Sequence, residues 1–271
     1  MSTTSTMLTF DAALRAKEEV LSGRSPSWFA KAMLVDSWQR SMAALGDPGA
    51  LREVPIVSQA DLDDEPLHLL GEPLVEMADA LRDSPVAMLL ANPQGVLLAR
   101  WFSDPRAGRH LDSTGSIRGA DLSESTVGTN AVGAVAATGQ AARILGPEHF
   151  CDFFSHSACT AEPIRDPATG SVRAVLTLTC PATAGLDLLA GWGMSIRAHL
   201  EAHLRSQTLR PASPRVEHTE EWALRRALKQ SGGDITLTCE LLGLSRATVY
   251  RRMKRYRIET PSGQPSSDVS T

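Results

Sequence analysis

Apolar residues recur at helical spacing near the start of the chain, and this pattern predicts a mainly helical region over residues 1–75. The strongest candidate helix is PSWFAKAMLVDSWQRSMAALG, in which Trp28, Met33 and Trp38 belong to an apolar set with mixed spacings. The helix is expected to end at Gly46, two residues before Pro48. The polar segment that follows, LREVPIVSQADLDDEP, contains two prolines and is interpreted as a connector.

Pairs of short apolar runs predict two β-hairpins in residues 76–184. VAMLLANPQGVLLAR turns at Asn-Pro-Gln-Gly, and PIRDPATGSVRAVLTLTC turns at Asp-Pro-Ala-Thr-Gly. Between them, GTNAVGAVAATG is rich in small residues, is flanked by Gly128 and Gly139, and is compatible with a helix. Strands, a helix and further strands indicate an α+β fold, with an antiparallel sheet and flanking helices.

Residues 185–206 form a further predicted helix, whose apolar positions step by three or four residues and approach a heptad seam. Two interpretations stay open: the helix packs on its own domain, or it forms a parallel homodimer seam. Residues 207–216 are expected to be a linker, and residues 259–271 a disordered tail. The seam consists of Leu186, Leu189, Gly193, Ile196, Leu200 and Leu204.

Three short helices are predicted over residues 217–258, which form a small all-α domain. The first ends at a Ser-Gly-Gly sequence, and Asp234 is a good N-cap for the second. Gly243 permits a tight turn, after which Ser245 caps the third helix. Two helices joined by a turn that contains glycine are typical of a helix-turn-helix unit.

The third helix of this unit has an apolar face with Val249 and Met253, and a basic face. In helix-turn-helix proteins the first residues of this helix contact base edges, and flanking cations contact phosphates. We therefore expect base readout from Arg246, Thr248 and Tyr250, and phosphate contacts from the later cations. A solvated basic tail is the alternative, but it would not require a capped turn. The candidate DNA-binding residues are Thr236, Ser245, Arg246, Thr248, Tyr250, Arg251, Arg252, Lys254 and Arg255.

Charge is unevenly distributed along the chain. The net charge is −4, yet residues 215–258 hold ten Arg and Lys against five Asp and Glu, which leaves 17 basic and 26 acidic residues elsewhere. A basic end on an acidic body favours double-stranded DNA as a partner of that end. We expect no membrane segment, because no apolar run approaches ~20 residues. The N-terminus lacks the pattern of a signal peptide, so a cytoplasmic protein with four reduced cysteines is expected.

Two parts of the chain resemble known families. ALRRALKQSGGDITLTCELLGLSRATVYRRMKRYRI resembles the Fis-type helix-turn-helix of bacterial enhancer-binding regulators. Such modules act as dimers, which implies a palindromic operator. SESTVGTNAVGAVAATGQ, GPEHF and SACTAEPIRDPATGSVRAVLTLTC are similar to the GAF-type sensory domain of acetoin and glycerol catabolism regulators.

The second resemblance implies a GAF-like sheet over residues 76–184 that binds a small-molecule effector. By the same resemblance, residues near the pocket come from Ser123 to Asn130 and from His149 to Cys159. The candidate ligand-binding residues are Glu124, Thr129, Asn130, His149 and Cys159.

The chain also departs from those regulators, which usually carry a central ATPase that remodels sigma-54 RNA polymerase. The phosphate-loop pattern G-x-x-x-x-G-K-[ST] does not occur in this sequence, and only a short linker separates the sensor from the helix-turn-helix. We therefore expect a ligand-responsive regulator without ATPase activity, either a repressor or an activator that contacts RNA polymerase.

The segment HFCDFFSHSAC raises two alternatives. His149, Cys151, His156 and Cys159 are possible metal ligands, but their spacings match no familiar zinc pattern, so we expect neither a metal nor another cofactor. The cysteines also suggest a thiol enzyme similar to GAF-fold methionine sulfoxide reductases, or a redox-sensing regulator. Since no Arg or Lys between residues 145 and 164 would lower a thiol pKa, we do not expect an enzyme.

Overall fold

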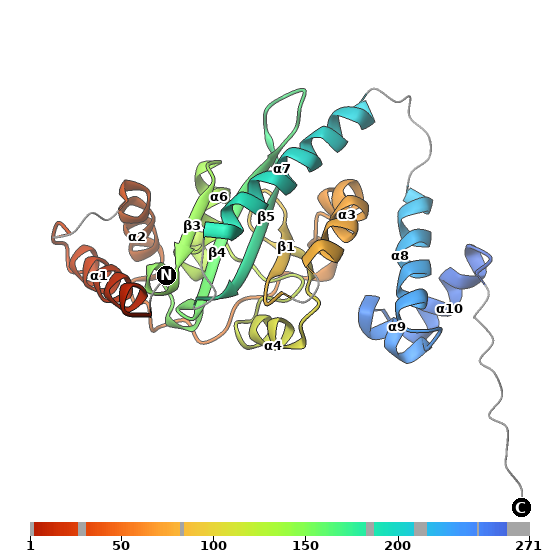
Figure 1. The fold of residues 1–271 in the computed structure, drawn as a ribbon, viewed down its shortest axis with the longest axis horizontal. Helices are drawn as coiled ribbons and strands as arrows, with labels where there is room; N and C mark the ends of the chain where they lie inside the picture. The colour runs from red at the N-terminus through yellow and green to blue at the C-terminus, as the bar shows by residue number, and fades with distance from the viewer. Residues whose placement is uncertain are drawn as a thin grey trace, which may run out of the picture. The chain divides into compact units, whose positions relative to one another are not determined.

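The computed structural model separates the chain into two compact units, Met1–Arg210 and Pro211–Thr271 (Figure 1). Each unit is described by itself. The residues that the structure describes are 3–26, 31–81, 84–182, 187–208, 216–242 and 244–258.

A five-stranded antiparallel sheet forms the centre of the first unit, with strand order β2-β1-β5-β4-β3. Both predicted hairpins are present. Asn92 Oδ1 accepts two backbone N–H groups in the β1–β2 turn, and Asp166 Oδ1 accepts two in the β4–β5 turn. Such bonds are typical of Asn and Asp at turns. The strands are β1 (Ala87–Ala91), β2 (Leu97–Trp101), β3 (Ala142–Leu145), β4 (Ser157–Arg165) and β5 (Val172–Pro181).

Helices flank the sheet, as the α+β prediction requires. The N-terminal helix predicted around Trp38 begins at Ala32, and the start of that prediction, at residues 27–30, lies outside the described residues. It ends at Leu45, where Gly46 adopts a φ of 75° that favours glycine. The helices of this unit are α1 (Thr3–Leu21), α2 (Ala32–Leu45), α3 (Glu65–Ala78), α4 (Pro105–Ser113), α5 (Glu124–Val127), α6 (Ala131–Thr138) and α7 (Asp187–Thr208).

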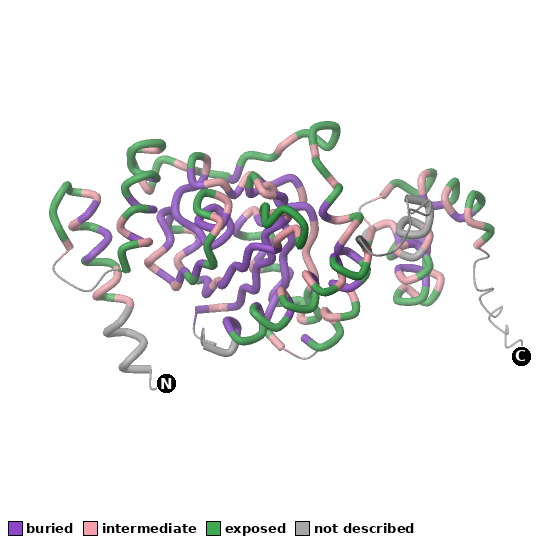
Figure 2. Tube along the Cα trace, turned by 90° about the horizontal axis from the view of Figure 1, so that it is seen from above, coloured by how far each residue is buried: buried purple, intermediate pink, exposed green. Residues whose placement is uncertain are grey.

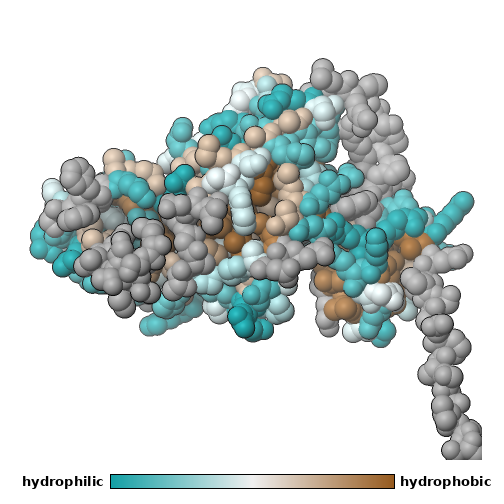
Figure 3. Space-filling view, in the orientation of Figure 1, coloured by the Kyte–Doolittle hydropathy of each residue, from teal (hydrophilic) through white to brown (hydrophobic). Residues whose placement is uncertain are grey.

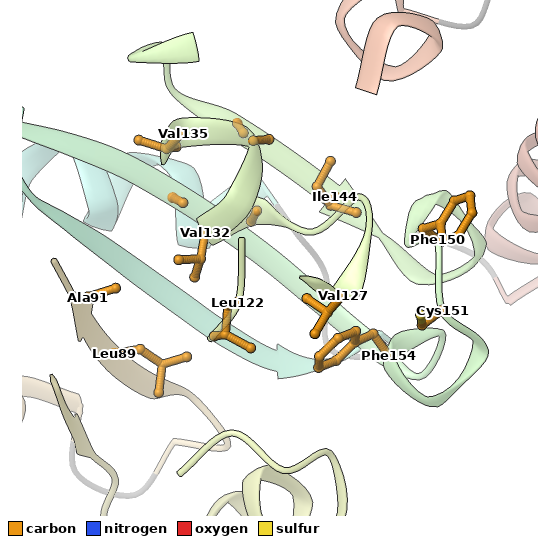
Figure 4. Close-up of a cluster of buried hydrophobic side chains, with 14 of the residues drawn as sticks. Leu89, Ala91, Leu122, Val127, Val132, Val135, Ile144, Phe150, Cys151 and Phe154 are labelled. Atoms are coloured by element: carbon orange, nitrogen blue, oxygen red, sulfur yellow. The ribbon is translucent and has the colours of Figure 1, made fainter. Parts of the chain in front are cut away.

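The sheet is buried on both faces, and the core runs through the middle of the unit (Figure 2). Side chains alternate between the faces along each strand. Leu89 and Ala91 point to the face that carries α6 and the loops around it (Figure 4). Met88 and Leu176 point to the opposite face, where α3 and α7 pack. The helices therefore form a layer on each side of the sheet.

The apolar seam of α7 lies against this second face. Leu200 is fully buried, and Leu189, Ile196 and Leu204 are each no more than 8% exposed. The structure therefore shows the first interpretation, a helix packed on its own domain. Leu186 lies outside the described residues. A homodimer remains a prediction, and with the seam buried it would have to use other surface.

The second unit contains the three predicted helices, α8 (Val216–Gln230), α9 (Ile235–Leu242) and α10 (Arg246–Arg255). Its core is small and includes Leu224 and Leu228 of α8 with Val249 and Met253 of α10. The fold class is therefore α+β with an additional all-α unit. Among the described residues, no helix has both the length and the apolar character to cross a membrane.

Candidate ligand pocket and DNA-binding helix

A cavity of about 400 Å³, its open mouth included, lies on the α6 face of the sheet. Its apolar wall comes from several elements, and Figure 4 shows Leu89 of β1, Leu122, Val132 of α6 and Phe154 around it. Its polar lining includes two side chains from β4, two from β5 and two imidazoles: Ser157, Cys159, Thr177, Thr179, His110 and His149.

Both histidines of the cavity are held neutral. His149 is 1% exposed, and burial lowers its pKa to about 4. Its Nδ1 lies 2.9 Å from the carbonyl oxygen of Gly146, which only accepts, so Nδ1 carries the proton and Nε2 is an acceptor. His110 Nε2 lies 2.7 Å from Ser157 Oγ. Burial, followed by the nearby His156, lowers the pKa of His110.

Thr177 is the least satisfied polar residue of the cavity. It lies on the central strand β5, between Leu89 of β1 and Ala161 of β4, which offer no side-chain partner. It is 1% exposed, and its hydroxyl has no hydrogen-bond partner among the described residues. Two residues along, Thr179 Oγ1 lies 3.2 Å from Cys159 Sγ. A buried hydroxyl without a partner is costly, so Thr177 needs an explanation.

Three of the predicted ligand-binding residues, Asn130, His149 and Cys159, line this cavity. The amide of Asn130 is already occupied, however. Its Oδ1 accepts from Gly133 N at 3.0 Å and caps α6, while its Nδ2 donates to the carbonyls of Leu122 and Gly128. Asn130 therefore fixes the loop before α6, and its polar atoms are not free to bind a ligand.

The other two, Glu124 and Thr129, are not among the residues that line the cavity. Their polar atoms face α2. Ser37 Oγ donates to Glu124 and lies 2.8 Å from Thr129 Oγ1, which also lies 3.0 Å from Ser41 Oγ. Arg40 pairs with both carboxylate oxygens of Glu124, at 2.6 and 3.1 Å. Because these bonds satisfy the buried carboxylate, its place here is structural.

Two residues of the N-terminal helices position His149, and sequence reasoning missed both. The buried ammonium of Lys17 donates to the carbonyls of His149 and Phe150, at 3.0 and 3.4 Å. Trp38 Nε1 donates to Glu148 O at 2.8 Å. More than 100 residues separate the partners in each bond, so no local pattern could reveal them.

The cysteines give no support to thiol chemistry. Burial raises the pKa of Cys159 to about 12, and that of Cys151 and Cys180 to about 11. A reactive cysteine requires a lowered pKa, because the thiolate is the nucleophile. Within the part of the chain that the structure describes, no group of three or more His, Cys, Asp or Glu residues is placed to hold a metal ion.

In the second unit, α10 presents the predicted basic face. Ser245 Oγ accepts from Thr248 N at 3.3 Å and caps the helix, while Val249 and Met253 are buried beneath it. The candidate contacts are on the other side: Thr236, Ser245, Arg246, Tyr250, Arg251, Lys254 and Arg255 are exposed, and Thr248 and Arg252 are half-buried.

The preceding helix α9 is held in the same way. Asp234 Oδ1 accepts from the backbone N–H groups of Thr236 and Leu237, at 2.7 and 3.2 Å. Figure 3 shows that part of the surface of this unit is hydrophobic. Its exposed apolar residues include Leu237 and Leu241, one turn apart on α9. The two capped helices form the helix-turn-helix that the sequence predicts.

Comparisons with known proteins agree with this arrangement. The model of the family described as "MimR, N-terminal domain" matches residues 9–201, and that of "Bacterial regulatory protein, Fis family" matches residues 216–256. A propane 2-monooxygenase operon transcriptional activator, MimR of Mycolicibacterium smegmatis, is 33% identical over 237 residues, which are 83% of this chain and 39% of the relative. The acetoin dehydrogenase operon transcriptional activator AcoR of Bacillus subtilis is 26% identical over 65% of this chain and 30% of the relative.

A solved structure of the E. coli DhaR(N)–DhaL complex shares the fold, with a TM-score of 0.60 at 20% identity over 65% of this chain and 61% of that chain. The chain spans about two fifths of the length of the MimR activator. These relatives are transcriptional regulators, as the two resemblances imply. The family match covers most of the first unit, and this chain belongs to the MimR N-terminal domain family, with a Fis-family helix-turn-helix after that domain.

Proposed function

We propose that this chain regulates transcription by binding double-stranded DNA through α10, in response to a small-molecule effector in the α6-face cavity. It does so as a homodimer on a palindromic operator and without hydrolysing ATP. The observation that carries the proposal is α10 itself, a capped helix whose apolar side is buried and whose exposed side carries Arg246, Arg251 and Lys254.

The two ends of α10 have different roles in this proposal. Arg246 and Tyr250 are exposed near its start, where a helix in the major groove meets base edges. The Thr248 hydroxyl lies 3.0 Å from Ser245 Oγ, so the cap fixes its position. Arg251, Arg252, Lys254 and Arg255 follow and contact phosphates, which orient the helix without reading sequence. Bound at a promoter, the protein blocks RNA polymerase or contacts it.

DNA selected from a random pool by the full chain tests this proposal. We expect a two-fold symmetric consensus. Arg246→Ala should reduce affinity for that consensus by about 1–3 kcal/mol and relax specificity at one base position per half-site. Lys254→Ala should instead weaken binding to all DNA sequences alike. It should also make the slope of log affinity against log salt shallower by about one for each phosphate that is no longer neutralised.

Lys229→Ala is the matched control, because it removes one exposed cation from α8 and leaves α10 unchanged. It should keep the consensus. If selection yields no consensus, the proposal is wrong. If Arg246→Ala behaves like Lys229→Ala, Arg246 is not a base-reading residue.

A further inference from the structure

The side of α7 that faces away from the sheet exposes no Asp, Glu, Lys or Arg between Leu189 and Leu204. The two charged residues of this stretch are half-buried and bond to β4 instead. Arg197 donates to Glu162, and Glu201 Oε1 accepts from the backbone N–H of Arg165 at 3.2 Å. Apart from His199, the exposed residues of this stretch are small or apolar, and they form the outer face of α7: Gly191, Trp192, Met194, Ser195, Ala198 and Ala202.

An exposed helix face without charge is unusual, because a helix at a protein surface typically carries charged and polar residues on its solvent side. α3 packs on the same face of the sheet as α7, and it follows this rule by exposing Glu72 and Glu76. α7 instead leaves Trp192 39% exposed and Met194 50% exposed. Trp and Met are enriched in protein interfaces, so the outer face has the composition of a surface that a partner covers.

The arrangement of the outer face suits a second helix. Small side chains run along its middle, and at about 100° per residue Trp192 and Met194 fall on opposite sides of that line. Small side chains let two helices approach closely, and the large ones then close over the contact from both sides. The middle line recurs at spacings of four, three and four residues: Gly191, Ser195, Ala198 and Ala202.

Charge favours a second copy of this chain as the partner. Outside residues 215–258 the chain holds 17 basic and 26 acidic residues, so two copies repel each other over most of their surface. A face without charge is where two such copies meet at the least electrostatic cost. It also offers no ion pair to a strongly charged partner of another kind.

The connection to the second unit favours a parallel pair. Only seven residues separate Thr208, the end of α7, from Val216, the start of α8, and a chain of this length reaches at most about 29 Å. The two recognition helices of a helix-turn-helix dimer bind about 34 Å apart. In a parallel pair both connections leave from the same end of the dimer, so both DNA-binding units can reach one operator.

We infer that the outer face of α7 is a homodimer interface, at which two copies of the chain pair in parallel along the line of small residues. This inference rests on the proposed function, which requires two copies of α10, and it identifies the surface that joins them. Both tests measure assembly without DNA. A chain that dimerises through this face but selects no DNA would contradict the proposed function alone, so the two failures are distinguishable.

Sedimentation equilibrium of the full chain at pH 7.5 measures the dissociation constant of the dimer. The range is about 1–100 µM, because an interface built on one helix face is small. Ala198→Glu should raise this constant at least tenfold, since it places two carboxylates opposite each other. Ala43→Glu, at an exposed position of α2, is the matched control and should leave the constant unchanged. A monomer throughout the range overturns the inference, and so does equal dimerisation of the two variants.

A cysteine on the middle line tests the direction of the pairing. In a parallel pair Ala202 lies opposite Ala202 of the second copy, so Ala202→Cys should form a disulfide between the copies on mild oxidation. Ala43→Cys should not, and neither should the unmodified chain, whose four cysteines are buried or half-buried. If Ala202→Cys forms no more covalent dimer than Ala43→Cys does, the parallel pair is wrong.

Discussion

The neutral ring of His149 predicts a specific sensitivity to acid. Its pKa is about 4 in the folded protein, against 6.5 for an unperturbed histidine. Between these values the unfolded chain binds a proton that the folded protein does not, so stability falls as the pH drops through this window. This pKa shift lowers the free energy of unfolding by about 2 kcal/mol between pH 7.5 and pH 5, and by about 3 kcal/mol in total once the pH is below 4.

Urea denaturation of the full chain at pH 7.5 and pH 5, followed by far-ultraviolet circular dichroism, measures this loss. His149→Asn keeps a donor near the carbonyl of Gly146 but cannot titrate. We expect the fall in unfolding free energy between the two pH values to be about 2 kcal/mol smaller in this variant. His199→Asn, at an exposed position of α7, is the control. Its unfolding free energy should fall between the two pH values by as much as that of the unmodified chain.

The comparison of two pH values cancels what the substitution changes in packing, because packing is lost equally at both. It also cancels the titration of the other groups that the proteins share. If His149→Asn and the unmodified chain lose the same stability on acidification, burial does not hold the ring neutral.

Three further predictions concern stability and use the same urea assay. Lys17→Met should lower the free energy of unfolding by about 1–3 kcal/mol, because two buried carbonyls lose their donor. Arg15→Met, at an exposed position of the same helix, should change it by no more than about 0.5 kcal/mol. Gly128→Ala should cost more than Gly170→Ala: both have φ above 70°, but only at Gly128 would the new Cβ lie 2.5 Å from a phenyl ring. Equal costs would show that the ring moves aside. Ser245→Ala should lower the free energy of unfolding of the second unit by about 0.5–2 kcal/mol and weaken DNA binding. An unchanged free energy of unfolding would contradict the capping role.

Local signals account for the parts of the fold that the sequence predicts well. The Asn-Pro-Gln-Gly and Asp-Pro-Ala-Thr-Gly turns, and the caps at Asp234 and Ser245, each act within a few residues. The seam of α7 was ambiguous for a physical reason. A stripe of apolar residues at spacings of three and four suits a sheet as well as a partner helix, and only the structure shows which one covers it.

The candidate site was predicted less well, because its motif is largely structural. GTNAVG stands out in the sequence, yet Asn130 caps α6, and a Cβ on Gly133 would lie 2.7 Å from Leu122 O. Thr129 and Glu124 bond to α2, some 90 residues earlier. Thr177, by contrast, gives no signal, because a threonine in an apolar strand is ordinary. What singles it out is the absence of a partner on either neighbouring strand.

The two faces of β4 connect the cavity with α7. Ser157 and Cys159 line the cavity, while Thr160 and Glu162 point to the opposite face, since successive side chains alternate. There Glu162 Oε2 accepts from Arg197 Nη1 of α7 at 3.0 Å. The pair is mostly shielded on the Glu162 side, at 5% exposure, so it holds α7 to the strand more firmly than a surface pair would. β4 therefore joins the wall of the cavity on one face of the sheet to the anchor of α7 on the other.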